Sequence, residues 1–124
     1  MKHLLLVGFG GALGSMLRFG ASTGLHALVG RGFPWGTLFV NVTGSFVMGL
    51  LYVSLVERAS LGPEWRSLLM VGVLGGYTTF SSFSIETMSL IEGGDLMKAA
   101  ANVLASIIVC LLAVWAGMML GRQL

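Results

Sequence analysis

The residues best suited to handle ions lie in one stretch, Gly75 to Ser84, which reads GGYTTFSSFS. Adjacent glycines and β-branched threonines lower helix propensity, and hydroxyl side chains compete for backbone hydrogen bonds. The stretch lies inside an apolar segment, where non-helical backbone survives only if it is buried in protein or lines a wet cavity. Transport proteins place ion sites at such interruptions. We therefore expect a helix that is interrupted near Gly75 to Thr79 and resumes around Phe80; the alternative is a continuous helix kinked at the glycine pair.

A second group of polar side chains lies in the charge-free segment from about residue 36 to residue 56. Asn41 and Ser45 are four residues apart, so they share one face of a helix. A buried Asn amide carries two N–H donors that need acceptors. Such an amide serves either a polar pathway or a contact between two membrane helices, and the sequence alone leaves both readings open.

Two charged side chains stand within apolar segments. Arg18 would lie near the middle of the first segment, where a charge is costly unless it faces protein or water. We favour an anion-attracting vestibule for Arg18 over the alternative, a structural bond to carbonyls at a helix end. Glu86 lies little more than one turn from the end of the third segment, so either a functional role or a place at the aqueous boundary fits it.

The composition defines the class of protein. The 124 residues are 56% hydrophobic and only 10% charged, whereas a soluble domain carries about 25% charged residues. The chain is therefore predicted to be an integral membrane protein. Its seven Lys and Arg are scattered singly, so we expect no nucleic-acid partner. Lone Cys110 can form no intrachain disulfide, and no nucleophile–base pair or metal-ligand cluster is present, so we expect no enzyme.

Four apolar segments organise the chain as a single all-α membrane domain, residues 1–124. Trp35 and Trp65 stand at the expected membrane interfaces, and Gly, Pro and charged residues separate the segments. The amino-terminal segment resembles a signal peptide, but no polar domain follows it, so we expect it to be the first span. The predicted spans are residues 4–29, 36–56, 65–91 and 96–120.

Small and polar residues recur at helical spacing and predict close packing. The last span carries Asn102, Ser106 and Cys110 at intervals of four, and the G-x-x-x-G pairs begin at Gly10, Gly20 and Gly117. Four short spans cannot enclose a substantial pore, so we expect an oligomer, most commonly a two-fold dimer. The cations near the ends of the spans set orientation only weakly and are compatible with head-to-tail pairing. They divide four to two between the sides: Lys2, Arg58, Arg66 and Arg122 against Arg31 and Lys98.

Three of these stretches together resemble a known family. They are GSMLR at residues 14–18, GTLFVNVTG at residues 36–44 and GGYTTFSSFSIE at residues 75–86. In these motifs, in length and in four-span layout, the whole chain is similar to the small fluoride channels called Fluc, or CrcB-like. The resemblance implies an antiparallel, dual-topology homodimer, surrounded by lipid in the cell (plasma or inner) membrane. It also implies passive export of cytoplasmic fluoride through two pores, and hence fluoride resistance.

The resemblance further implies roles for particular residues. A central sodium ion would be held by the backbone carbonyls of Gly75 and Thr78, where the third span is broken. The fluoride pathway would include the residues that match the family's pore positions: Asn41, Phe80, Phe83, Ser81, Ser82, Ser106, Arg18 and Glu86. Asn102 and Cys110 stand where members vary, so their roles stay open.

Fluoride chemistry fits these residue types. Fluoride is small and strongly hydrated, so a dry pore must replace its water with hydrogen-bond donors. Amides and hydroxyls supply donors without a fixed charge that would trap the ion. Phe80 and Phe83, three residues apart, can present the positive edges of their rings.

The main alternative function is a proton-coupled small multidrug-type exporter, which shares the size and the four-span plan. Such an exporter needs a titratable carboxylate deep in its substrate site. The first span offers Arg18 instead, and Glu86 lies near a helix end. A non-transporting assembly subunit is a third possibility, and it would leave the polar cluster of the third span unexplained.

Overall fold

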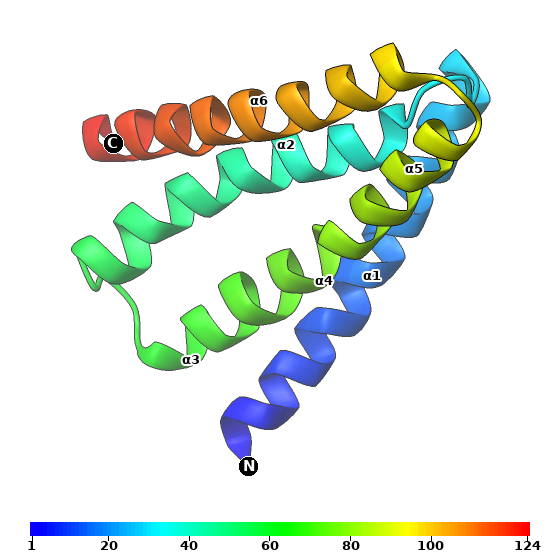
Figure 1. Ribbon diagram of the computed structural model, residues 1–124. Helices are drawn as coiled ribbons and strands as arrows, with labels where there is room; N and C mark the ends of the chain where they lie inside the picture. The colour runs from blue at the N-terminus through cyan, green and yellow to red at the C-terminus, as the bar shows by residue number, and fades with distance from the viewer.

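The computed structural model describes residues 1–124 and is built entirely of helices (Figure 1). In chain order the helices are α1 (Lys2–Val29), α2 (Trp35–Leu51), η1 (Tyr52–Glu57), α3 (Pro63–Trp65), η2 (Arg66–Leu74), α4 (Gly75–Tyr77), α5 (Phe80–Glu92) and α6 (Leu96–Gln123). The two η segments are π-helical, and each continues the α-helix before it without a gap.

Four helical segments are long and apolar enough to cross a membrane: Lys2–Val29, Trp35–Glu57, Pro63–Glu92 and Leu96–Gln123. The prediction of an all-α membrane protein with four spans is therefore confirmed. The largest difference from the expected bounds is at the end of the last helix, which reaches Gln123 rather than Leu120. Arg122 holds this final turn through a bidentate ion pair with Glu57, in which the Nη2–Oε2 distance is 2.7 Å.

Glycines allow two pairs of helices to approach closely. Where α1 meets η2, a Cβ on Gly10 would lie 2.9 Å from Val73 N. Where α6 meets α2, a Cβ on Gly117 would lie 3.1 Å from the carbonyl carbon of Phe46. These two contacts therefore depend on residues without a side chain, as expected for G-x-x-x-G pairs. The pair that begins at Gly20 has no such neighbour within the chain.

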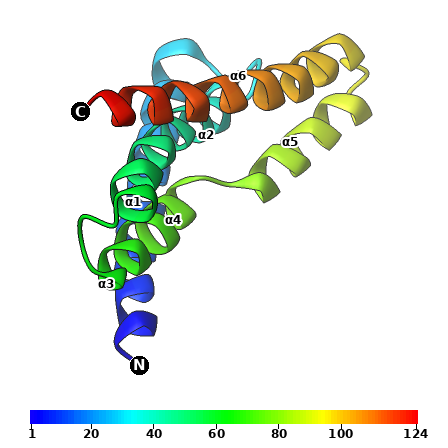
Figure 2. The same ribbon diagram turned by 90° about the vertical axis from the view of Figure 1, so that its left-hand side faces the viewer.

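The helices form an open arrangement rather than a closed bundle. The α1 helix lies against η2 and α4, α2 lies along α6, and α5 projects away from them (Figures 1 and 2). Only 17 of the 124 residues are buried, so most large apolar side chains point outward instead of into a core. Apolar surface of this extent needs lipid or protein around it, which agrees with the four apolar spans.

Between α4 and α5 the backbone is extended for two residues. Thr78 has φ −85° and ψ 157°, and Thr79 has φ −152° and ψ 119°. Figure 2 shows this extended link. Thr79 also begins the next helix, because its Oγ1 accepts a hydrogen bond from Ser82 N–H at 3.2 Å and so caps α5. We call these two residues the Thr78–Thr79 link.

The glycine pair lies beside this link and is helical, although the sequence placed it within the interruption. Gly75 and Gly76 both belong to α4. The reason for a glycine at position 76 is packing: a Cβ there would lie 3.2 Å from Ser15 N of α1. Close approach of α1, rather than backbone freedom, therefore accounts for Gly76.

Candidate ion-conduction site

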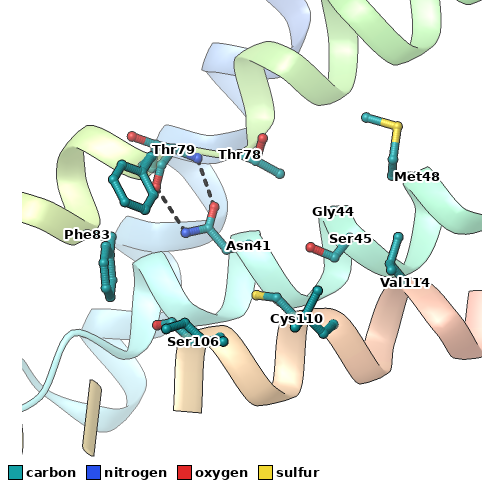
Figure 3. A pocket seen from close by; sticks show the side chains of 13 residues that line it. Asn41, Gly44, Ser45, Met48, Thr78, Thr79, Phe83, Ser106, Cys110 and Val114 are labelled. Atoms are coloured by element: carbon teal, nitrogen blue, oxygen red, sulfur yellow. Dashed lines mark hydrogen bonds between the residues drawn. The ribbon is translucent and has the colours of Figure 1, made fainter. Parts of the chain in front are cut away.

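A groove with a volume of about 440 Å³ lies between α2, the Thr78–Thr79 link, α5 and α6 (Figure 3). It brings together four of the residues expected in a fluoride pathway: Asn41, Phe80, Phe83 and Ser106. None of the side chains that line the groove belongs to Asp, Glu, Lys, Arg or His. The groove can therefore hold an ion by hydrogen bonds and dipoles but not by a salt bridge.

Asn41 uses both ends of its amide to hold the link. Its Oδ1 accepts a hydrogen bond from Thr79 N–H at 2.8 Å, and its Nδ2 donates to Thr79 O at 3.0 Å (Figure 3). The side chain thus pairs with one residue of extended backbone much as a neighbouring strand would. An Asn amide has two N–H donors, so one hydrogen on Nδ2 is left for another acceptor.

Phe80 and Phe83 form a tilted ring pair on the first turn of α5. Their centroids are 5.3 Å apart and their planes meet at 43°. Both rings line the groove, and Phe80 is 78% exposed in the single chain. A tilted pair presents an edge as well as a face, so the groove has positive ring edges available to an anion.

The two serines between these rings have different surroundings. Ser81 is exposed, and its Oγ lies 3.3 Å from Thr79 Oγ1. Ser82 Oγ accepts a hydrogen bond from Thr79 Oγ1 at 3.2 Å, and its side chain lines a second, smaller pocket of about 110 Å³. Thr79 lines both the groove and this second pocket, so the link separates the two spaces.

Arg18 makes a structural bond beside the second pocket. Its Nε donates to Gly76 O at 3.0 Å, the contact with a helix-end carbonyl that the sequence left as the alternative role. The side chain also lines the second pocket, together with hydroxyl groups from Ser22, Thr23 and Thr37. The guanidinium of Arg18 has five N–H donors, so one bond to Gly76 leaves donors for that pocket.

Glu86 does not join the other predicted residues. It lines a third pocket of about 270 Å³ near the end of α1, with His26 and Arg31. Its Oε1 is buried and has no hydrogen-bond partner in the chain. The carboxylate is thus separate from the groove that contains Asn41.

The backbone carbonyls of Gly75 and Thr78 are among those at the link that have lost their usual helical donors. The N–H of Thr79, four residues after Gly75, bonds to Asn41 rather than to Gly75 O. The N–H of Ser82, four residues after Thr78, bonds to Thr79 Oγ1 rather than to Thr78 O. A carbonyl without a donor at membrane depth needs another partner. No group of three His, Cys, Asp or Glu side chains is placed to hold a metal, so a cation here would depend on these oxygens.

Known proteins are similar to this sequence over nearly its whole length. A family model described as CrcB-like protein, Camphor Resistance (CrcB), matches residues 5–118. The chain belongs to the CrcB-like family. This CrcB-like chain is 53% identical over 121 residues to the fluoride-specific ion channel FluC of Methylococcus capsulatus (strain ATCC 33009 / NCIMB 11132 / Bath). That alignment covers 98% of the chain and 53% of the relative, so the chain spans about half of that relative's length.

Two further relatives match end to end. The chain is 50% identical to the fluoride-specific ion channel FluC of Coxiella burnetii (strain Dugway 5J108-111), an alignment that covers 98% of the chain and 99% of the relative. It is 49% identical to the fluoride-specific ion channel FluC of Rhizobium meliloti (strain 1021), over 100% of the chain and 99% of the relative. Both relatives are named as channels rather than as enzymes.

The site of this CrcB-like chain contains contacts that the sequence did not predict. Thr79 pairs with Asn41 and caps α5; its only sequence signal is a hydroxyl residue at the expected start of a helix. Thr43 Oγ1 lies 2.8 Å from Tyr77 OH and ties α2 to α4. Cys110, whose role was open, lines the groove.

Proposed function

We propose that this protein is a fluoride-selective channel that lets cytoplasmic fluoride leave the cell passively and so gives fluoride resistance. The observation that carries the proposal is the uncharged groove, where Asn41 keeps a free amide hydrogen near the ring pair of Phe80 and Phe83. The full-length relatives named as fluoride-specific ion channels support the same ion.

The groove suits fluoride for physical reasons. A small anion gives up its hydration shell only where donors replace it. Asn41 Nδ2 and the Ser106 hydroxyl supply donors, and the ring edges of Phe80 and Phe83 supply weaker positive charge. With no fixed cation in the lining, binding stays weak enough for the ion to leave.

We assign the second pocket to the approach to this groove. Arg18 attracts anions there, and the hydroxyls of Ser81, Ser82 and Thr79 continue the donors toward the groove. Thr79 borders both spaces, so an ion that moves between them passes this residue. Glu86, in its own pocket beside Arg31, would act at the outer end of the route.

The uncharged lining also favours a channel over a proton-coupled small multidrug-type exporter. Coupling to protons needs a carboxylate that both substrate and proton reach. The carboxylate nearest to the site in sequence, Glu86, lines a different pocket from Asn41. Uncoupled passage is therefore the simpler mechanism for this groove.

Purified protein in proteoliposomes should release fluoride electrically, and chloride much more slowly. A fluoride electrode and a chloride electrode would follow efflux side by side, with and without a proton gradient. Fluoride release should be the same in both conditions, because no group in the groove must be protonated during transport. Strict dependence on the gradient, or chloride flux equal to that of fluoride, would favour the exporter instead.

We infer that the working unit is an antiparallel homodimer, with each third span crossing as two half-helices joined at the Thr78–Thr79 link. The groove of a single chain is open to its surroundings, and Phe80, Ile85 and Met88 of α5 are exposed. A second copy would cover these side chains. Two-fold symmetry, the commonest kind in oligomers, would then produce two equal pathways, set in the lipid of the cell (inner) membrane.

The weak Lys/Arg bias predicts that charge alone can fix the orientation of this protein. Glu92→Lys with Asp95→Lys adds positive charge on the side of Arg31 and Lys98, whereas several Lys appended after Leu124 bias the other side. Asp95 makes no side-chain capping bond, so its replacement should be tolerated. Each biased variant should be inactive alone, and fluoride efflux should return when the two are expressed together. Accessibility labelling would show whether a variant is inserted in a single orientation. Full activity from such a population would rule out the antiparallel dimer.

We also propose a sodium ion on the dimer axis, held by the carbonyls of Gly75 and Thr78. These are the two oxygens whose helical donors are diverted to Asn41 and to the Thr79 hydroxyl. Hard, uncharged oxygen ligands without a carboxylate suit a monovalent cation better than a divalent one. When bound, the ion supplies positive charge at mid-membrane and satisfies the carbonyls; the chain's own residues make the anion path.

A further inference from the structure

The position of α5 depends on few contacts, and one of them is a buried polar pair with α6. Asn102 Nδ2 donates to Thr87 Oγ1 at 2.9 Å. Thr87 Oγ1 in turn donates to the carbonyl of Phe83, one turn earlier on α5, at 2.7 Å. Asn102 is 2% exposed and Thr87 is 8% exposed. This pair is the one side-chain hydrogen bond between α5 and α6.

The pair lies one helical turn from the groove. In the antiparallel hairpin of α5 and α6, Phe83 is four residues before Thr87 and Ser106 is four residues after Asn102. Phe83 and Ser106 face the groove from opposite helices. In Figure 2 the two helices separate with distance from the turn that joins them. The Asn102–Thr87 bond is thus close to the apex of the hairpin, where it holds the two helices together.

Asn102 and Thr87 do not themselves form the groove. Neither side chain lines it, and Asn102 is too buried to meet a hydrated ion. A membrane helix that buries an amide against a neighbour gains a directional contact, because apolar side chains alone give helices in lipid little preference for one register. The polar pair therefore sets register and spacing for the side chains one turn away.

We propose that Asn102 and Thr87 are positioning residues for anion selectivity: their hydrogen bond fixes the separation of Phe83 from Ser106 across the groove. The inference rests on the proposed fluoride conduction. With the bond intact, the ring edge and the hydroxyl stand at one fixed distance, and a small anion is favoured. When it is lost, α5 pivots at the Thr78–Thr79 link, the groove loosens, and a larger anion such as chloride passes more easily.

The test compares Asn102→Leu, Thr87→Val, the double variant and the conservative Thr87→Ser in proteoliposomes. Interhelical hydrogen bonds in membranes are of modest strength, so the fluoride-to-chloride flux ratio should fall about three- to tenfold in each single variant. Thr87→Ser keeps the hydroxyl and should have the same flux ratio as the wild type. The double variant leaves no unpaired polar group and should regain thermal stability, but its ratio should stay low.

Val53→Ala is the matched control for stability. Val53 is fully buried in η1, away from α5, so its truncation lowers stability by leaving a cavity while the groove is unchanged. Its flux ratio should equal that of the wild type. A fall of the ratio in Val53→Ala would mean that instability alone changes selectivity, and this would overturn the positioning role.

19F NMR provides a second measurement for variants whose flux is too low to measure. A 19F label on the ring of Phe83 should shift or broaden in Thr87→Val and stay unchanged in Thr87→Ser. Unchanged flux ratio and unchanged 19F signal in all four variants would refute the role of the pair while leaving fluoride conduction standing. No selective fluoride flux from the wild type would refute the proposed function instead.

Discussion

Replacing Asn41 with aspartate should reduce fluoride flux by about ten- to a hundredfold while the protein still assembles. Aspartate keeps an oxygen to accept the Thr79 N–H bond, but it loses Nδ2, which donates to Thr79 O and has one hydrogen to spare. It also adds a negative charge to an uncharged anion path. A hydrogen bond to a charged group contributes about 1.5–3 kcal/mol, and each 1.4 kcal/mol is a factor of ten.

A second substitution in the same groove tests the aromatic edge separately. Phe80→Ile keeps apolar bulk but removes the ring, so fluoride flux should also fall severely. Phe9→Ile makes the same change on an exposed face of α1, outside the groove, and should keep wild-type flux. Efflux would be measured by fluoride electrode, with size-exclusion profiles to confirm assembly. Wild-type flux from assembled Asn41→Asp and Phe80→Ile proteins would assign both residues to packing.

The four spans could be predicted because an apolar run of about twenty residues is a strong and local signal. The position of the extended backbone was harder to predict, since it depends on contacts between residues that are distant in the sequence. Gly75 and Gly76 lower helix propensity, yet they are helical because η2 leads into α4 and α1 packs closely on Gly76. Between Pro63 and Glu92, only Thr78 and Thr79 are not helical, and there Asn41 supplies partners for the backbone of Thr79.

The site could likewise be predicted only in part: the sequence indicated its residues but not the contacts between them. Asn41, Phe80, Phe83 and Ser106 could be proposed from residue type and motif, and they do meet at one groove. The partners could not be proposed, because spacing says nothing about contacts between distant residues. Asn41 and Thr79 are 38 residues apart, and Arg18 and its acceptor Gly76 are 58 apart.

Removing sodium should destabilise the dimer and abolish fluoride flux. Gly75 O and Thr78 O would each cost several kcal/mol if left unpaired at membrane depth. A ligand that binds only the folded dimer stabilises it by about 2.7 kcal/mol at a hundred times its dissociation constant. The melting temperature in sodium should therefore exceed that in a large organic cation at equal ionic strength. Calcium and magnesium should not replace sodium, because the proposed ligands include no carboxylate.

Thr79→Val and Thr79→Ser make this prediction specific to the link. Valine keeps the β-branched shape but lacks the hydroxyl that accepts Ser82 N–H, so α5 loses its cap and the extended backbone that carries Thr78 O is held less firmly. Thr79→Val should need more sodium than the wild type for the same melting temperature, and Thr79→Ser should not. The ion should stay bound during fluoride passage, because its ligands are backbone atoms outside the conducting side chains. Undiminished stability and flux after exhaustive sodium removal, with no cation density on the two-fold axis, would refute the site.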